Sequence, residues 1–140
     1  MTPLRVLIVE DEPITLQALV LIVRSLGCEP AAAATAEEGL NLALSSPHPD
    51  FALIDLKLQG SAYDGLELIR RLVGHPDLSK MKTVAHTASV SEDQRKAARH
   101  AGACGILLKP FRTRDVAAAL NLSIPTRPIS GNGEDSLAGR

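Results

Sequence analysis

Asp55 stands at the end of an apolar run, and a carboxylate in that place can serve as a nucleophile or as a metal ligand. The run, residues 51–54, is typical of a strand that is buried on both faces of a sheet. Asp55 would then lie at the carboxyl end of the strand, where open parallel sheets bind their ligands. A single acid there can also be a helix cap or a loop residue, so its chemistry depends on the residues that join it.

Four further polar residues end or follow other apolar runs. They are Glu10 and Asp11 after residues 4–9, Thr87 at the end of residues 83–87, and Lys109 after residues 105–108. In a parallel sheet these strand ends share one edge, so three carboxylates, a hydroxyl and an ammonium group are expected to converge. Each residue has a plain alternative, as the acidic start of a helix, an ordinary strand residue or a surface cation.

Such a group of carboxylates needs a cation. Two unit charges about 4 Å apart repel by roughly 4 kcal/mol at an effective dielectric near 20. Mg²⁺ takes oxygen ligands octahedrally and accepts phosphate oxygens among them. Asp55 could then attack a phosphorus centre, while Lys109 pairs with the phosphoryl oxygens and Thr87 donates a hydrogen bond to one of them. The sequence therefore predicts a phosphoryl acceptor.

Expected strands alternate with expected helices along the chain. The strands are expected at residues 4–9, 28–34, 51–55, 83–87 and 105–108, and the helices at residues 13–26, 35–45, 66–73, 91–102 and 113–122, with a loop at 75–81. This alternation predicts a parallel sheet with right-handed crossovers and helices on both faces. Because Pro30 is tolerated in edge strands, residues 28–34 are expected at an edge.

Local signals mark the ends of the helices. Residues 35–38 and 91–94 have the capping-box pattern, and Pro13 suits the first turn of a helix. Gly27 and Gly102 supply left-handed stops. These signals agree with the apolar periodicity.

The first helix is unusually apolar. It carries two apolar stripes, one of Ile14, Ala18, Leu21 and Ile22 and the other of Leu16, Leu19, Val20 and Val23. One stripe must cover the sheet. The other is expected either to pack on a neighbouring helix or to be offered to a partner.

Composition limits the classes of partner. The chain has 140 residues and a net charge of -1 with both signs interspersed, so direct binding to nucleic acid or to a membrane is not expected. No secretory pattern opens the sequence, which indicates a cytoplasmic protein. Cys28 and Cys104 are expected at opposite sheet edges, on the order of 19 Å apart, as buried or half-buried thiols without a disulfide.

We expect one domain at residues 1–122 and a flexible tail at 123–140, because the tail has too few apolar residues to pack. No room is left for a second, effector domain. The four histidines, His48, His75, His86 and His100, lack ligand spacing and are interpreted as structural or solvated.

Taken together, the motifs resemble the receiver domain of bacterial two-component response regulators over residues 4–122. They are Val9-Glu10-Asp11, Leu53-Ile54-Asp55, His86-Thr87-Ala88-Ser89, Ala101-Gly102-Ala103 and Leu108-Lys109-Pro110-Phe111. The resemblance implies a flavodoxin-like α/β fold, doubly wound, with a five-stranded parallel sheet in the order 2-1-3-4-5. It also suggests a cis peptide between Lys109 and Pro110.

The resemblance also assigns roles at the site. Asp11 and Asp55 would bind Mg²⁺, Glu10 would hold a metal-bound water, and the backbone carbonyl of Lys57 would be a further ligand. Asp55 would accept a phosphoryl group from a sensor histidine kinase or a histidine phosphotransfer protein in a phosphorelay.

Three residues or segments depart from the family pattern. Ile106 stands at the switch position, which is usually aromatic, so a switch of Thr87 and Ile106 would work by aliphatic repacking. The loop after Asp55 is two residues longer than usual and has Gly60 in place of the usual proline, which should alter access to the acid. Glu10 replaces the more frequent Asp.

The resulting hypothesis is a stand-alone response regulator that signals by phosphorylation-dependent binding to an unknown output protein. It would not be a turnover enzyme, and its only chemistry would be Mg²⁺-assisted self-phosphorylation and autodephosphorylation. An aspartyl-phosphate phosphatase would need a second Asp where this chain has Lys57, and a lid. A pseudo-receiver, which binds partners without phosphorylation, stays open as an alternative.

Overall fold

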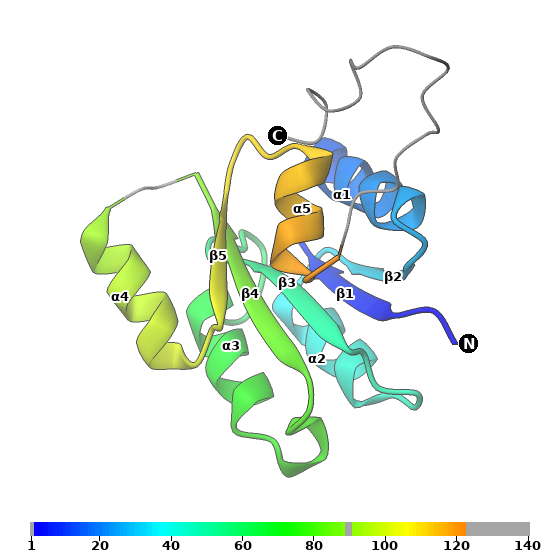
Figure 1. Ribbon diagram of the computed structural model, residues 1–140. Coiled ribbons are helices and arrows are strands. Elements are labelled where there is room, and N and C mark those ends of the chain that lie inside the picture. The colour runs from blue at the N-terminus through cyan, green and yellow to red at the C-terminus, as the bar shows by residue number, and fades with distance from the viewer. Residues whose placement is uncertain (1, 89–90, 123–140) are drawn as a thin grey trace, which may run out of the picture.

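Within residues 2–88 and 91–122, which the computed structural model describes, five parallel strands form one sheet in the order β2-β1-β3-β4-β5 (Figure 1). The strands are β1 (Arg5–Val9), β2 (Glu29–Ala33), β3 (Phe51–Asp55), β4 (Lys82–Thr87) and β5 (Gly105–Leu108). The helices are α1 (Pro13–Ser25), α2 (Ala36–Leu44), α3 (Gly65–Val73), α4 (Glu92–Ala101) and α5 (Thr113–Ala119). The predicted flavodoxin-like fold and strand order are confirmed.

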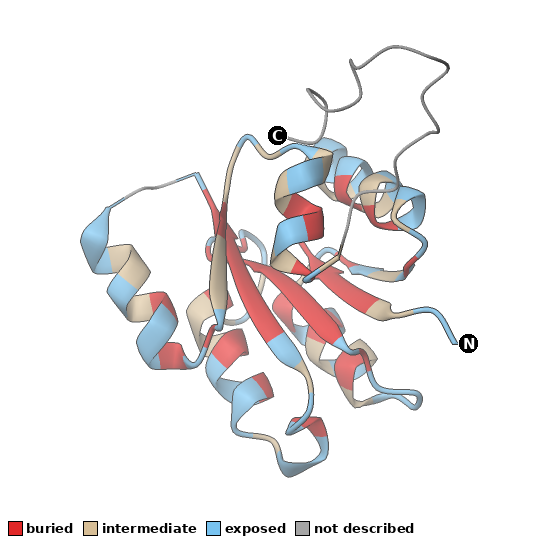
Figure 2. Cartoon of the chain, in the orientation of Figure 1, coloured by how far each residue is buried: buried red, intermediate tan, exposed pale blue. Residues whose placement is uncertain are grey.

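The central strands are buried on both faces, as their continuous apolar sequences predict. Every residue of β3 is buried, and β1 and β4 are exposed or half-buried only at their first residues (Figure 2). β2 lies at one edge and is half-buried or exposed over most of its length, which suits Pro30 and its alanines. The carboxyl ends of buried strands therefore carry the polar residues of interest.

Helices cover the two faces of the sheet unequally. α1 and α5 pack on one face, and α2, α3 and α4 lie over the other (Figure 1). Because side chains alternate along a strand, Leu53 and Val84 face α1 and α5. Two residues further along, Asp55 and His86 follow on that same face, and they are directly paired in the β3–β4 register.

The hydroxyl caps predicted at Thr35 and Ser91 are present, but the capping box at residues 91–94 is incomplete, because Gln94 Oε1 has no hydrogen-bond partner among the described residues. The Thr35 hydroxyl accepts a hydrogen bond from the Glu38 amide at 3.1 Å, and the Ser91 hydroxyl accepts one from the Gln94 amide at 3.2 Å. The Glu38 carboxylate, however, accepts from the Ala34 amide at 2.9 Å, one residue before the position that a capping box would use. The cap still satisfies two amides at the start of α2.

Several boundaries differ from those predicted. α5 ends at Ala119 and not at residue 122, because Asn121 adopts a left-handed conformation with φ of 57°. Part of the predicted loop at residues 75–81 is a short 3-10 helix, η1 (Pro76–Leu78). Within the described residues, no helix combines the length and apolar character that a membrane span needs.

Both cysteines are free, as predicted, but Cys104 is exposed and not buried or half-buried. It directly precedes the edge strand β5, where no neighbouring strand covers it. The predicted flexible tail at residues 123–140 lies outside the described residues.

Candidate functional site

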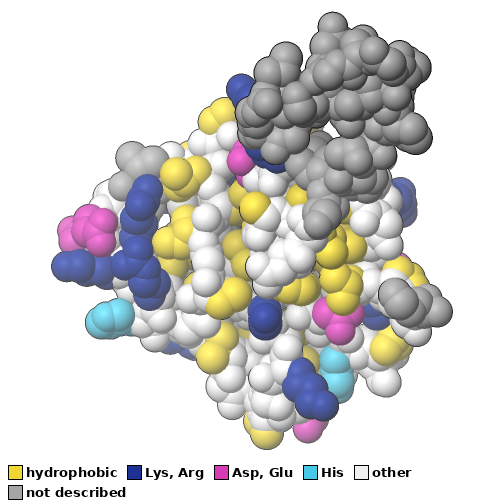
Figure 3. Space-filling view, viewed as in Figure 1, with side chains coloured by type: hydrophobic (Ala, Val, Ile, Leu, Met, Phe, Trp, Pro, Cys, Tyr) yellow, Lys and Arg dark blue, Asp and Glu magenta, His cyan; other side chains and the backbone are white. Residues whose placement is uncertain are grey.

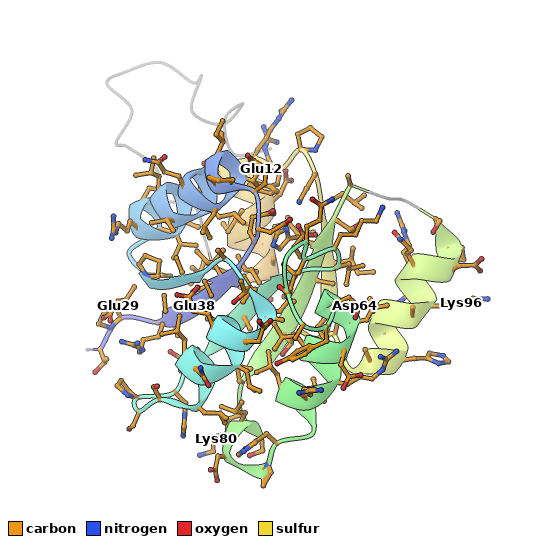
Figure 4. All side chains as sticks on the ribbon, turned by 180° about the vertical axis from the view of Figure 1, so that it is seen from behind. Glu12, Glu29, Glu38, Asp64, Lys80 and Lys96 are labelled. Atoms are coloured by element: carbon orange, nitrogen blue, oxygen red, sulfur yellow. The ribbon has the colours of Figure 1, made fainter. Side chains whose placement is uncertain are left out.

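Lys109 joins two carboxylates that are far apart in the sequence. Its Nζ atom donates to Glu10 Oε1 at 2.8 Å and to Asp55 Oδ2 at 3.1 Å. Glu10 follows β1, Asp55 ends β3 and Lys109 follows β5, so the contact forms at the carboxyl edge of the sheet. In Figure 4, Glu12, at the start of α1, marks this edge and Lys80 marks the opposite end of the molecule.

The three charges are largely removed from water. Glu10 is 0% exposed and Asp55 is 5% exposed. Burial raises the pKa of Glu10 to about 7, although the hydrogen bond from Lys109 opposes the shift. Burial also works against the charge on Lys109, but its hydrogen bonds with Glu10 and Asp55 outweigh burial and raise the pKa of Lys109. The pKa of Glu10 thus stays raised because burial outweighs the hydrogen bond from Lys109.

Both oxygens of Asp55 are held in place. Oδ2 accepts from Lys109, and Oδ1 accepts from the backbone amide of Lys57 at 3.1 Å. The side chain of Lys57 is exposed. The β3–β4 pairing extends past Asp55, because the amide of Leu56 donates to the carbonyl of His86 at 3.2 Å. The carboxylate is thus fixed on a rigid part of the sheet.

Asp11 lies against the loop that follows Asp55. Its Oδ2 atom accepts a hydrogen bond from the amide of Gln59 at 3.1 Å. The loop turns at Gly60, whose φ of 81° is the left-handed conformation that glycine adopts without strain. This is the loop whose length departs from the usual family pattern, and one of the predicted metal ligands holds its first part.

The same loop is fastened to the start of α2. The Ser61 hydroxyl accepts from the amide of Ala36 at 2.9 Å, and the Glu37 carboxylate accepts from the amide of Ala62 at 2.9 Å. These two contacts run in opposite directions between the loop and the helix. They restrain the loop beside Asp55.

Thr87 and Ile106 lie on the face of the sheet that α3 and α4 cover. Thr87 is 4% exposed and ends β4, and its carbonyl accepts from the amide of Lys109 at 2.9 Å. Ile106 is half-buried and pairs with Ala85, two residues before Thr87 on the same face. Thr87, Lys109 and Ile106 are therefore carried by one strand pair.

His86 also belongs to the site, which the sequence analysis missed. Its side chain is fully buried, and Nδ1 lies 3.6 Å from Glu10 Oε1. Burial lowers its pKa to about 4, so the ring is neutral at neutral pH. The Phe111 ring meets it edge-on, with ring centroids 6.3 Å apart. The spacing of the histidines along the sequence does not indicate that His86 lies in the site. The pairing of β4 with β3, which places His86 beside Asp55, could have indicated it.

The chain belongs to the response regulator receiver domain family, whose model matches residues 6–121. Receiver domains are the signalling domains of two-component systems. The cis peptide suggested between Lys109 and Pro110 is present, together with a second one between Ser46 and Pro47.

The curated relatives are regulatory proteins that are about twice as long as this chain. The transcriptional regulatory protein BaeR of Escherichia coli O6:H1 is 34% identical over 114 residues, which are 81% of this chain and 45% of BaeR. The methanol utilization control regulatory protein MoxX of Paracoccus denitrificans is 33% identical over 119 residues, covering 84% of this chain and 52% of MoxX. The chain spans about half the length of these relatives.

Solved structures share the fold over most of their length. A response regulator from Chloroflexus aurantiacus has a TM-score of 0.76 at 31% identity, covering 86% of this chain and 99% of that one. The receiver domain of sensor histidine kinase PA1611 from Pseudomonas aeruginosa has a TM-score of 0.76 at 24% identity. The match covers 86% of this chain and 96% of that one. That structure holds a magnesium ion in its active site cleft, and at this identity the likeness concerns the fold alone.

Proposed function

We propose that this chain is a response-regulator receiver domain that accepts a phosphoryl group on Asp55. The donor would be a sensor histidine kinase or a histidine phosphotransfer protein. The observation that carries the proposal is the contact of Lys109 Nζ with both Glu10 and Asp55 at the carboxyl edge of the sheet. A cation held beside a nearly buried carboxylate is what a phosphoryl acceptor requires.

The oxygen donors of the site suit Mg²⁺. Glu10, Asp11 and Asp55 offer carboxylates and Lys57 offers a backbone carbonyl, which is the ligand chemistry that this ion prefers. The Glu10 and Asp55 side chains that would hold the ion are both buried at the carboxyl edge of the sheet. When bound, Mg²⁺ would stabilise negative charge on the phosphoryl oxygens.

Transfer needs a nucleophile and a stabilised product. An Asp55 carboxylate oxygen attacks the phosphorus of the donor phosphohistidine, the P–N bond breaks, and its electron pair stays on the imidazole nitrogen. The product is an acyl phosphate on Asp55. Lys109 then pairs with a phosphoryl oxygen in place of Asp55 Oδ2, and Thr87 donates a hydrogen bond to another.

The output face would be the groove between α4 and β5. The groove is lined by Arg95, Arg99, Ala103, Cys104, Gly105, Ile106 and Leu108. Figure 3 shows Lys and Arg side chains gathered over α4 beside apolar surface along β5. Because Ile106 and Thr87 share one face of the sheet, a movement of Thr87 toward the phosphoryl group would repack Ile106 and reshape the groove.

The donor would dock on α1. Ile14 is 77% exposed and Leu21 is 57% exposed, so part of one predicted apolar stripe has no partner within the described residues. Ile14 also lines a pocket with Lys109, Pro110 and Phe111, which brings this surface next to the acceptor. An apolar docking surface at the edge of the site would orient an incoming phosphohistidine.

The remaining expectations stay predictions. They are the cytoplasmic location, the domain boundary at residue 122, the absence of catalytic turnover, and the protein–protein character of the output. The pseudo-receiver alternative makes the opposite prediction for phosphorylation, so one experiment separates the two.

That experiment is incubation with acetyl phosphate and Mg²⁺, followed by intact-mass analysis. Wild type should gain one phosphoryl group that hydroxylamine removes, and Asp55→Asn should gain none. Asp77→Asn, an exposed Asp in η1 at the opposite end of the molecule, is the matched control and should behave as wild type. An adduct that survives in Asp55→Asn would refute the site, and the absence of any adduct in wild type would favour the pseudo-receiver.

A further inference from the structure

His86 lies in the site without a part in the phosphoryl transfer. Its side chain is 0% exposed, and neither ring nitrogen makes a well-formed hydrogen bond among the described residues, although the ring interacts with the backbone of Val9. An unsatisfied buried polar group is unfavourable. The ring packs at nearly a right angle to that of Phe111, with an interplanar angle of 85°. The chain thus has a histidine at a buried position where an apolar side chain would be more favourable for stability.

The spacing around His86 suits a shared ion better than a hydrogen bond. Its Nδ1 atom lies 3.6 Å from Glu10 Oε1, which is too long for a hydrogen bond. Two donor atoms bound to one ion at about 2.1 Å and at a tetrahedral angle lie about 3.4 Å apart. Glu10, Asp55 and His86 each offer one ligand atom, and these atoms lie within 4.8 Å of one another. Small side-chain rotations would bring all three onto one ion.

We propose that Glu10, Asp55 and His86 form a site for a divalent transition metal, with Zn²⁺ as its natural type of occupant. A ligand set that includes an imidazole suits Zn²⁺ and Co²⁺, whereas Mg²⁺ prefers oxygen alone. The site differs from the proposed magnesium site in its nitrogen ligand.

Occupation of this site would displace Lys109. Its Nζ atom now binds the same Glu10 Oε1 atom that faces His86, and it also binds Asp55. The Lys109 side chain is 23% exposed, so it can move toward solvent when a metal takes these oxygens. If Asp55 is the phosphoacceptor, as proposed above, the metal-bound form could not be phosphorylated.

Calorimetric titration with Co²⁺ and with Zn²⁺ tests the site directly. Wild type should bind one ion, and His86→Leu should bind it at least about tenfold more weakly, as expected when a ligand or its support is lost. His100→Leu, which changes an exposed histidine on α4, is the matched control and should bind as wild type. Circular dichroism would establish that each variant is folded. Equal Co²⁺ affinity in wild type and His86→Leu would overturn the proposal.

A second measurement needs no substitution. In ¹⁵N NMR of the histidine rings, saturating Zn²⁺ should shift one ring nitrogen of His86 strongly and leave the other unmoved. Unchanged His86 nitrogens would overturn the proposal even if His86→Leu failed to fold. Neither measurement involves phosphorylation, so the outcome is independent of whether Asp55 is the acceptor.

Discussion

Gly65 lies so close to Asp55 that a Cβ atom at position 65 would be 1.9 Å from the carbonyl oxygen of Asp55. The same Cβ atom would be 2.7 Å from the Cα atom of Leu56. The amide of Gly65 donates to the carbonyl of Leu56 at 3.1 Å, so α3 begins directly against the end of β3. The position of the acceptor carboxylate therefore depends on a glycine at the start of the next helix.

Replacing Gly65 by Ala should destabilise the fold and disturb the acceptor. The neighbouring atoms are backbone, which cannot rotate away, so we expect a loss of about 3 kcal/mol in the free energy of unfolding, measured with urea. Gly105→Ala is the matched control, because its Cβ would meet only Val84 Cγ2 at 4.0 Å and should change stability little. Equal stability of Gly65→Ala and wild type would show that the close approach is not a constraint.

Glu10→Gln should stabilise the metal-free protein at high pH. The pKa of Glu10 is raised to about 7 in the folded state, so its ionisation opposes folding as the pH rises from 4.5 to 7. The stability difference between variant and wild type should be near zero below pH 4.5 and should grow to at most about 3 kcal/mol above pH 7. Thermal unfolding in EDTA across this range measures the difference. A constant difference at all pH values would contradict the assignment.

His86→Leu should have the opposite pH signature. The pKa of His86 is lowered to about 4 in the folded state, so wild type should lose stability as the pH falls from 6.5 through 4. The Leu variant lacks this loss and should gain stability relative to wild type in that window. Urea unfolding at several pH values measures the gain, and His100→Leu serves as the control. The effects of Glu10 and His86 oppose each other between pH 4.5 and 6.5, so wild type itself should vary little there.

Strand ends and local caps made most of the fold predictable. The apolar run before Asp55 and the short apolar runs before Glu10 and Lys109 indicate buried parallel strands, and their ends necessarily share an edge. The serine and threonine caps act within a few residues, so the sequence also places the starts of α2 and α4. These features depend on local sequence or on topology alone.

The features that the sequence analysis did not predict depend on the register between strands and on close backbone packing. His86 was interpreted as an isolated histidine because only the pairing of β3 with β4 places it beside Asp55. Gly65 was left outside the helix predicted at residues 66–73, because its constraint comes from the backbone at the end of another strand. The end of α5 depends on Asn121, a residue that tolerates a left-handed conformation without requiring it.

Lys109→Met should destabilise the metal-free protein and respond to Mg²⁺. Without the ammonium group, Glu10 and Asp55 face each other with no compensating charge. We expect a loss of roughly 2 kcal/mol, below the 3–5 kcal/mol typical of a fully buried pair, because Lys109 keeps some contact with water. Urea unfolding measures the loss, Mg²⁺ should reduce it, and adding Glu10→Gln should recover part of it. Lys80→Met, an exposed change at the opposite end of the molecule, should leave stability unchanged.

Ser61→Ala should shorten the lifetime of the phosphorylated form. The Ser61 hydroxyl holds the loop after Asp55 to the amide of Ala36, and its loss leaves the Glu37 contact with Ala62 and the Asp11 contact with Gln59 to restrain the loop. A hydrogen bond worth about 1 kcal/mol corresponds to roughly a fivefold change in the population of the open loop, and water would reach the acyl phosphate more often. Intact-mass analysis after removal of the phosphodonor gives the decay rate.

Glu38→Gln changes a residue on the same helix whose carboxylate accepts from the amide of Ala34. It is the control and should decay as wild type. If Ser61→Ala also decays at the wild-type rate, the fastened loop does not protect the phosphoryl group, and the lifetime must be set within the cluster of Glu10, Asp55 and Lys109.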